Sequence, residues 1–195
     1  MRPCLSSFRR EESGFTLVEL AVGLAVGLFL IVMTVSFLMK TLGIIEELKI
    51  ARDIRDQGIF AVQTIEREFR RTLEYGGNLR GLTNQMVKAE ASGYIVSINK
   101  NGNKFELTID NGTLETKAFP NGDLVCSSFT VKALVTVDDP DDPDPSVRID
   151  RYVDGSDPYA YMARVIVVEF ELEDDEHGIS RLFKAAFASA AATGG

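Results

Sequence analysis

The chain has 195 residues, enough for a single globular domain of ordinary size. Its 21 basic and 29 acidic residues give a formal net charge of −8. This balance argues against non-specific nucleic-acid binding, which depends on neutralising phosphates with Lys and Arg.

The N-terminal region carries a single carboxylate inside a membrane-length apolar stretch. Glu19 lies four residues after Phe15, and an uncharged apolar run continues to Met39. About 20 apolar residues suffice to span a bilayer, whereas an ionised acid at the bilayer centre costs about 2.5–3.5 kcal/mol. An acid in such a position therefore needs a partner. Cleavage between Gly14 and Phe15 would supply one, because it creates a positive α-amino group on Phe15, one helical turn from Glu19.

Two simpler interpretations compete with this one. A secretory signal peptide places its apolar region before the cleavage site, whereas residues 1–14 contain no apolar core. A plain single-pass anchor remains open, since residues 15–39 are long enough to span. Basic residues occur on both sides of the apolar run, so charge alone does not orient it. Glu19 favours a filament subunit, because a plain anchor has no use for an acid there.

Gly14, Phe15 and Glu19, with a short charged leader before them and an apolar helix after them, resemble the class III signal of type IV pilins and type II secretion pseudopilins. The resemblance implies that a prepilin peptidase cuts after Gly14 and methylates the new amine of Phe15. It implies that Glu19 guides the subunit into a growing filament. It also implies a single-pass inner-membrane protein with its head outside the cytoplasm, and partners that include other minor and major pilins or pseudopilins and inner-membrane lipid.

Beyond Lys40 the apolar residues continue at helical spacing as far as Leu73, with charged residues between them. No proline interrupts this region, so one helix is predicted from about Phe15 to Leu73. Gly58 is its expected weak point, and the pair at 76–77 its expected stop. Residues 56–71 resemble the polar helix of PilW-type minor pilins and of the J-type pseudopilin.

After Gly77 the pattern changes to strand period. Two Asn-Gly turns, at 101–102 and 111–112, separate alternating runs at 94–98, 104–109 and 113–119. Further strands are predicted at 128–137, 147–153, 163–172 and 180–187, and the last pair is similar to the closing hairpin of J-type and PilW-type heads.

The predicted fold class is α+β: a long N-terminal transmembrane and amphipathic helix packed on an antiparallel β-sheet head. The expected segments are a cleaved leader at 1–14, a transmembrane helix at 15–39, its amphipathic continuation at 40–75 and the head at 76–195.

Catalytic and metal-binding signals are weak. His177 is the only histidine, and no nucleophile elbow, phosphate loop or paired zinc motif occurs, so no enzyme and no cofactor are expected. The acidic run 138–145 could supply oxygen ligands to calcium, as could Asp150, Asp154 and Asp157 less readily. The prolines in that run and its dense like charge favour a solvated loop instead. Cys126 would be alone after loss of the leader, which carries Cys4, and is expected to be a buried small hydrophobe.

The sequence thus predicts a minor pilin of the PilW or J type that acts structurally, near the tip of a type IV pilus. One alternative is the J-type pseudopilin of a type II secretion system. Another, of a different class, is a single-pass inner-membrane protein whose exported head binds a ligand or an ion. Direct binding of nucleic acid is not expected.

Overall fold

The structure is a computed structural model that describes residues 15–138, 148–157, 163 and 165–188. The chain separates into two compact units, Met1–Glu46 and Glu47–Gly195. One helix and nine strands occur in the described residues: α1 (Leu17–Glu74), β1 (Asn78–Thr83), β2 (Met86–Ala91), β3 (Tyr94–Asn101), β4 (Lys104–Asp110), β5 (Leu114–Phe119), β6 (Val125–Asp138), β7 (Arg148–Asp154), β8 (Val165–Asp174) and β9 (Ile179–Ala188). The predicted α+β class is confirmed.

The first unit contains the apolar part of α1. Among the described residues, α1 is the helix long and apolar enough to cross a membrane, judged by length and composition, and none of its apolar window is buried within the protein. Large apolar side chains from Leu17 to Leu42 are exposed to the surroundings. This exposure is typical of a segment whose natural solvent is lipid.

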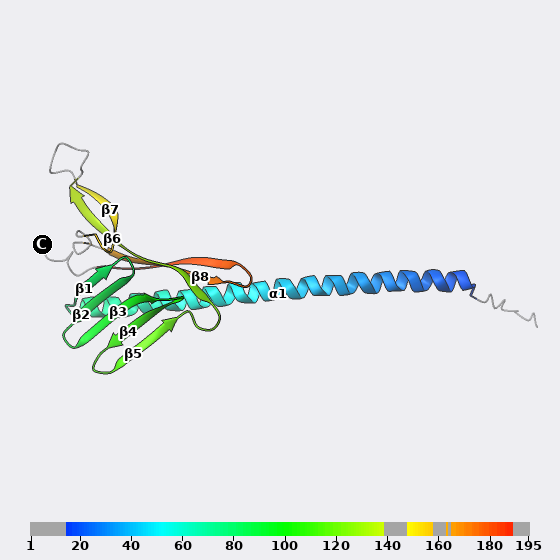
Figure 1. Cartoon of the computed structure of the whole chain (residues 1–195), viewed down its shortest axis with the longest axis horizontal. Helices are drawn as coiled ribbons and strands as arrows, with labels where there is room; N and C mark the ends of the chain where they lie inside the picture. The colour runs from blue at the N-terminus through cyan, green and yellow to red at the C-terminus, as the bar shows by residue number, and fades with distance from the viewer. Residues whose placement is uncertain (1–14, 139–147, 158–162, 164, 189–195) are drawn as a thin grey trace, which may run out of the picture. The chain divides into compact units, whose positions relative to one another are not determined.

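In the second unit α1 becomes amphipathic. Its buried apolar residues recur at helical spacing, and they are Ile54, Ala61, Ile65, Phe69 and Leu73. Figure 1 shows this cyan part of α1 alongside both sheets of the unit.

The helix runs without interruption through Gly58, the expected weak point. The missing side chain serves packing instead. An added Cβ at position 58 would lie 2.1 Å from Cζ of Phe183, so the glycine lets a ring of β9 rest against the helix backbone.

The helix ends as predicted at the glycine pair. Gly76 adopts a φ of 75° and donates its N–H to the carbonyl oxygen of Leu73, while Gly77 donates to that of Thr72. This pairing satisfies carbonyls that the end of a helix leaves without partners, and the left-handed φ favours glycine.

The first sheet is a five-stranded antiparallel meander in the order β1-β2-β3-β4-β5. The hairpin between β3 and β4 was predicted, but its turn is shifted by one residue. Asn101 pairs with Lys104, so the loop is Gly102-Asn103. Gly102 has a φ of 60° and no described non-glycine residue has a positive φ. A glycine at the first loop position is typical of a type II′ turn, whereas the Asn-Gly pattern predicted a turn centred on residues 101–102.

Strands β1 and β2 were not predicted. They pair with each other around the turn Asn84-Gln85, and β2 continues the sheet to β3 with an alternating burial pattern. Ala89 of β2 is fully buried, yet Lys88 and Glu90 beside it have low strand propensity. Burial against neighbouring strands outweighs that propensity here.

The second sheet has the order β7-β6-β8-β9, and its strands are antiparallel. Strand β9 is its outer strand on one side. The backbone N–H of Ala186 in β9 donates to Oε1 of Glu66 on α1 at 3.1 Å. The predicted strands at 128–137, 147–153, 163–172 and 180–187 correspond to β6 to β9.

The two sheets and the helix share one hydrophobic core. Phe105 of β4 lies at its centre, with ring centroids 4.7 Å from Phe170, 5.4 Å from Phe119 and 5.5 Å from Phe129. Burial of each such ring contributes about 1.5–3 kcal/mol to folding. The second unit therefore consists of both sheets together with the part of α1 that completes their core.

Candidate functional site

The start of α1 is organised by Thr16 and Glu19. The backbone N–H of Thr16 and its hydroxyl both donate to Oε2 of Glu19, at 3.1 and 3.0 Å. In return the backbone N–H of Glu19 donates to Oγ1 of Thr16 at 3.2 Å. These reciprocal bonds form a capping box, which satisfies backbone donors that the first turn of a helix leaves open.

Of the two predicted processing residues, the structure describes Phe15, which adjoins this box. Phe15 precedes Thr16, the residue before α1, and is 84% exposed, while Gly14 lies outside the described residues. Glu19 is also exposed. The arrangement presents a carboxylate in the first helical turn, where the helix dipole favours negative charge.

Thr16 was missed by the sequence reasoning, although its signal was present. The pattern Thr-x-x-Glu before an apolar run indicates a capping box, and Thr16 and Glu19 have that spacing. Glu19 therefore has a second role, in starting the helix.

A charged cluster joins α1 to the first sheet. The hydroxyl of Tyr94 donates to Oε2 of Glu68 at 2.7 Å, and Arg67 pairs with Oε1 of Glu68 at 2.8 Å. Burial alone would raise the pKa of Glu68, but the bonds from Tyr94 and Arg67 outweigh it and hold that pKa below its usual range. Burial, together with the bond to Glu68, raises the pKa of Tyr94 to about 12. The cluster fixes the helix against β3.

Cys126 behaves as the sequence predicts. Its side chain is buried in the core, and its thiol donates to the carbonyl oxygen of Ser128 at 3.1 Å. Burial raises the pKa of the thiol to about 11. The thiol is therefore protonated at neutral pH and unreactive as a nucleophile.

Most of the acidic run 138–145 lies outside the described residues, which omit 139–147. Within the described residues no group of three or more His, Cys, Asp or Glu side chains is arranged to hold a metal ion. Asp150 accepts a hydrogen bond from Oγ1 of Thr136, and Asp154 lines a pocket on the second sheet. These two aspartates do not converge with Asp157 on one point in any such group.

His177 belongs to the turn between β8 and β9. Its backbone N–H and its Nδ1 each lie 2.8 Å from Oδ1 of Asp174. The hydrogen bonds from His177 hold the pKa of Asp174 below its ordinary value. This arrangement closes the turn that Gly178, at a φ of 64°, completes.

Comparison with protein families shows that residues 9–35 match a prokaryotic N-terminal methylation motif. The match spans Gly14, Phe15 and Glu19 and supports a type IV pilin or pseudopilin with a prepilin-type signal. No curated protein and no solved structure matches the chain.

Proposed function

We propose that this protein is a minor pilin of a type IV pilus, which enters the filament through α1 and helps to initiate or cap assembly through contacts of its head. The observation that carries the proposal is the prepilin-type motif at residues 9–35, which includes the start of an apolar, membrane-length helix. The α+β architecture agrees with it, because α1 both supplies the apolar segment and completes the core of the head.

In this proposal a prepilin peptidase cuts between Gly14 and Phe15 and methylates the new amine of Phe15. Before assembly the subunit resides in the inner membrane as a single-pass protein, with its head outside the cytoplasm. Glu19 pairs with the N-terminal amine of a neighbouring subunit, since an acid in an apolar setting is stabilised by an opposite charge. The partners of the subunit in the filament are other minor and major pilins.

The decisive experiment is the identity of the mature N-terminus. Mass spectrometry of protein from a strain with an active peptidase should find an N-terminus at Phe15, with the mass of one added methyl group. Gly14→Arg should leave the precursor at full length, because the peptidase is expected to need a residue without a side chain before the cut. A wild-type protein that keeps Met1, or is cut elsewhere, would contradict the proposal.

Two other functions fit the same motif or the same anchor. A J-type pseudopilin of a type II secretion system shares the signal and the helix. Deletion of the gene separates the two, because loss of surface pili favours the pilin and loss of protein secretion favours the pseudopilin. A single-pass protein with an exported ligand- or ion-binding head would instead remain uncut in the mass spectrum.

A further inference from the structure

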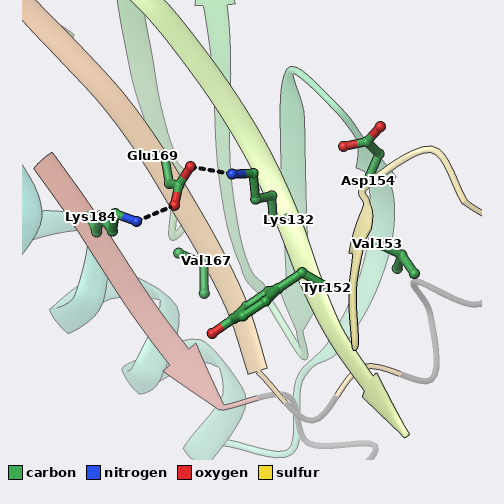
Figure 2. A pocket seen from close by; sticks show the side chains of 7 residues that line it. All are labelled: Lys132, Tyr152, Val153, Asp154, Val167, Glu169 and Lys184. Carbon is green, nitrogen blue, oxygen red and sulfur yellow. Dashed lines mark hydrogen bonds and ion pairs between the residues drawn. The ribbon is translucent and has the colours of Figure 1, made fainter. Parts of the chain in front are cut away.

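The outer face of the second sheet carries a pocket of about 320 Å³. All four strands contribute to it, as Figure 2 shows: Tyr152 and Asp154 come from β7, Lys132 from β6, Val167 and Glu169 from β8, and Lys184 from β9. Small-molecule sites typically enclose about 300–1,000 Å³ and combine apolar walls with a few placed polar groups. The pocket is at the lower end of that range.

The charges in the pocket cancel one another. Glu169 lies between two lysines, with its Oε2 2.5 Å from Nζ of Lys132 and its Oε1 2.7 Å from Nζ of Lys184. Asp154 stands directly opposite Lys132 in the register of β6 and β7. Hydrogen bonds from the two lysines hold the pKa of Glu169 below its usual range, so it is ionised at neutral pH. A charged ligand would have to compete with these internal pairs, which favours an uncharged one.

The same groups offer both kinds of hydrogen bond. The carboxylates of Asp154 and Glu169 can accept hydrogen bonds from a ligand, and the ammonium groups of Lys132 and Lys184 can donate hydrogen bonds to it. The two ammonium groups carry three donors each, so their bonds to Glu169 leave further donors for a ligand. A suitable ligand must therefore carry several groups that donate and accept, such as hydroxyls.

The rest of the lining is apolar and aromatic. Val167 lies on the outer face of the sheet, yet only 8% of it is exposed to solvent. Tyr152 is 61% exposed, and its side chain reaches across the sheet from β7 towards Val167 (Figure 2). The exposed ring beside a covered valine forms an apolar platform next to the charged row. A row of ion pairs that served only stability would require neither the exposed ring of Tyr152 nor the buried Val167.

We propose that this pocket binds a neutral pyranose sugar, as a single unit of a glycan. A pyranose has an apolar C–H face that can lie on the ring of Tyr152. Its hydroxyls can donate to Asp154 and Glu169 and accept from the lysines. The inference goes beyond the filament role and does not depend on it, because the pocket lies wholly in the second unit.

The test uses the purified full-length chain in a detergent without a sugar head group. It is applied to immobilised glycans that end in glucose, galactose, mannose or N-acetylglucosamine, with sialic-acid and glucosamine termini as charged arms. We expect binding to at least one neutral terminus and weaker binding to the charged ones. Tyr152→Ala should weaken that binding about tenfold, and Tyr152→Phe, which keeps the ring, should stay within about threefold of wild type.

The matched control is Tyr75→Ala. Tyr75 is another exposed tyrosine, at 73%, but it follows α1 and does not line the pocket. The Tyr75→Ala variant should bind the glycans as wild type does. Circular dichroism should show that Tyr152→Ala, Tyr152→Phe and Tyr75→Ala are all folded. The proposal is overturned if no neutral glycan binds, if a charged terminus binds more tightly than every neutral one, or if Tyr152→Ala binds as well as wild type.

Discussion

The ring of Phe183 on β9 packs directly against the backbone of Gly58 on α1, two residues separated by most of the head sequence. A Cβ on residue 58 would lie 2.1 to 2.4 Å from three atoms of that ring. Phe183 is itself part of the core and stacks on Phe170, with ring centroids 5.5 Å apart. The glycine thus sets how closely β9 approaches the helix.

Gly58→Ala should therefore destabilise the protein by about 1–3 kcal/mol, because the ring must leave its rotamer or the helix must shift. The gain in helix propensity from alanine, up to about 1 kcal/mol, offsets only part of this loss. Thermal unfolding of the full chain, followed by circular dichroism, measures the effect. Gly43→Ala is the control, since a Cβ there meets nothing within 4 Å. Equal unfolding of Gly58→Ala and wild type would show that the contact is not tight.

Tyr94→Phe should destabilise the protein by about 1.5–3 kcal/mol at pH 7, because it removes the hydrogen bond to the buried, ionised Glu68. The pKa of Tyr94 is raised from 10.0 to about 12 in the folded protein. The contribution of this tyrosine is therefore fully present below pH 10 and is lost as the pH rises through 12. The difference in melting temperature between wild type and Tyr94→Phe should shrink across that window, and a constant difference would contradict the assignment.

Three substitutions separate the two roles of the capping box. Glu19→Gln removes the charge but retains an acceptor for Thr16, since glutamine also serves at this position. Glu19→Val removes both, and Thr16→Val weakens the cap while it keeps the charge. If charge pairing drives assembly, both Glu19 variants should be processed and membrane-bound but poorly incorporated into filaments, and Thr16→Val should be incorporated better than either. Normal incorporation of Glu19→Gln, scored by immunoblotting of sheared filaments, would assign the acid to helix capping instead.

Millimolar calcium should change the melting temperature of the full chain little, and no more than magnesium does. The prolines within residues 138–145 hinder wrapping of the acidic run around an ion. An ion bound only to the folded state raises stability by about 2.7 kcal/mol when it is at a hundredfold excess over its dissociation constant. A calcium-specific rise of that size, abolished when Asp141, Asp142 and Asp144 are replaced by Asn, would make the run a functional site.

Most of the fold could be predicted from local patterns. Long apolar periodicity predicted α1, and the alternation with glycine turns predicted β3 to β9. The hairpin β1–β2 could not be found in this way, because Lys88 and Glu90 flank a buried Ala89 whose role depends on neighbours in β1 and β3. The one-residue shift of the β3–β4 turn likewise depends on the pairing of Asn101 with Lys104.

The capping box at Glu19 and the pocket around Glu169 also differ in how far they could be predicted from local sequence. Glu19 and its partner Thr16 are close in sequence, so the first site could be found from a short motif. The pocket around Glu169 combines side chains from four strands, and its neutral charge follows from strand register rather than from any run of residues. The burial of Val167 could not be predicted from the sequence either, because it depends on the position of Tyr152 on another strand.

The bond from Ala186 to Glu66 gives α1 a protective role. An open strand edge is a template on which another chain can add a strand, and such addition begins aggregation. Because the carboxylate of Glu66 accepts the N–H of Ala186, a helix side chain occupies a position on β9 that a foreign strand would otherwise use. A fragment that begins after α1 would lose this hydrogen bond together with the helical part of the core, and its open β9 edge would favour intermolecular β-sheet growth.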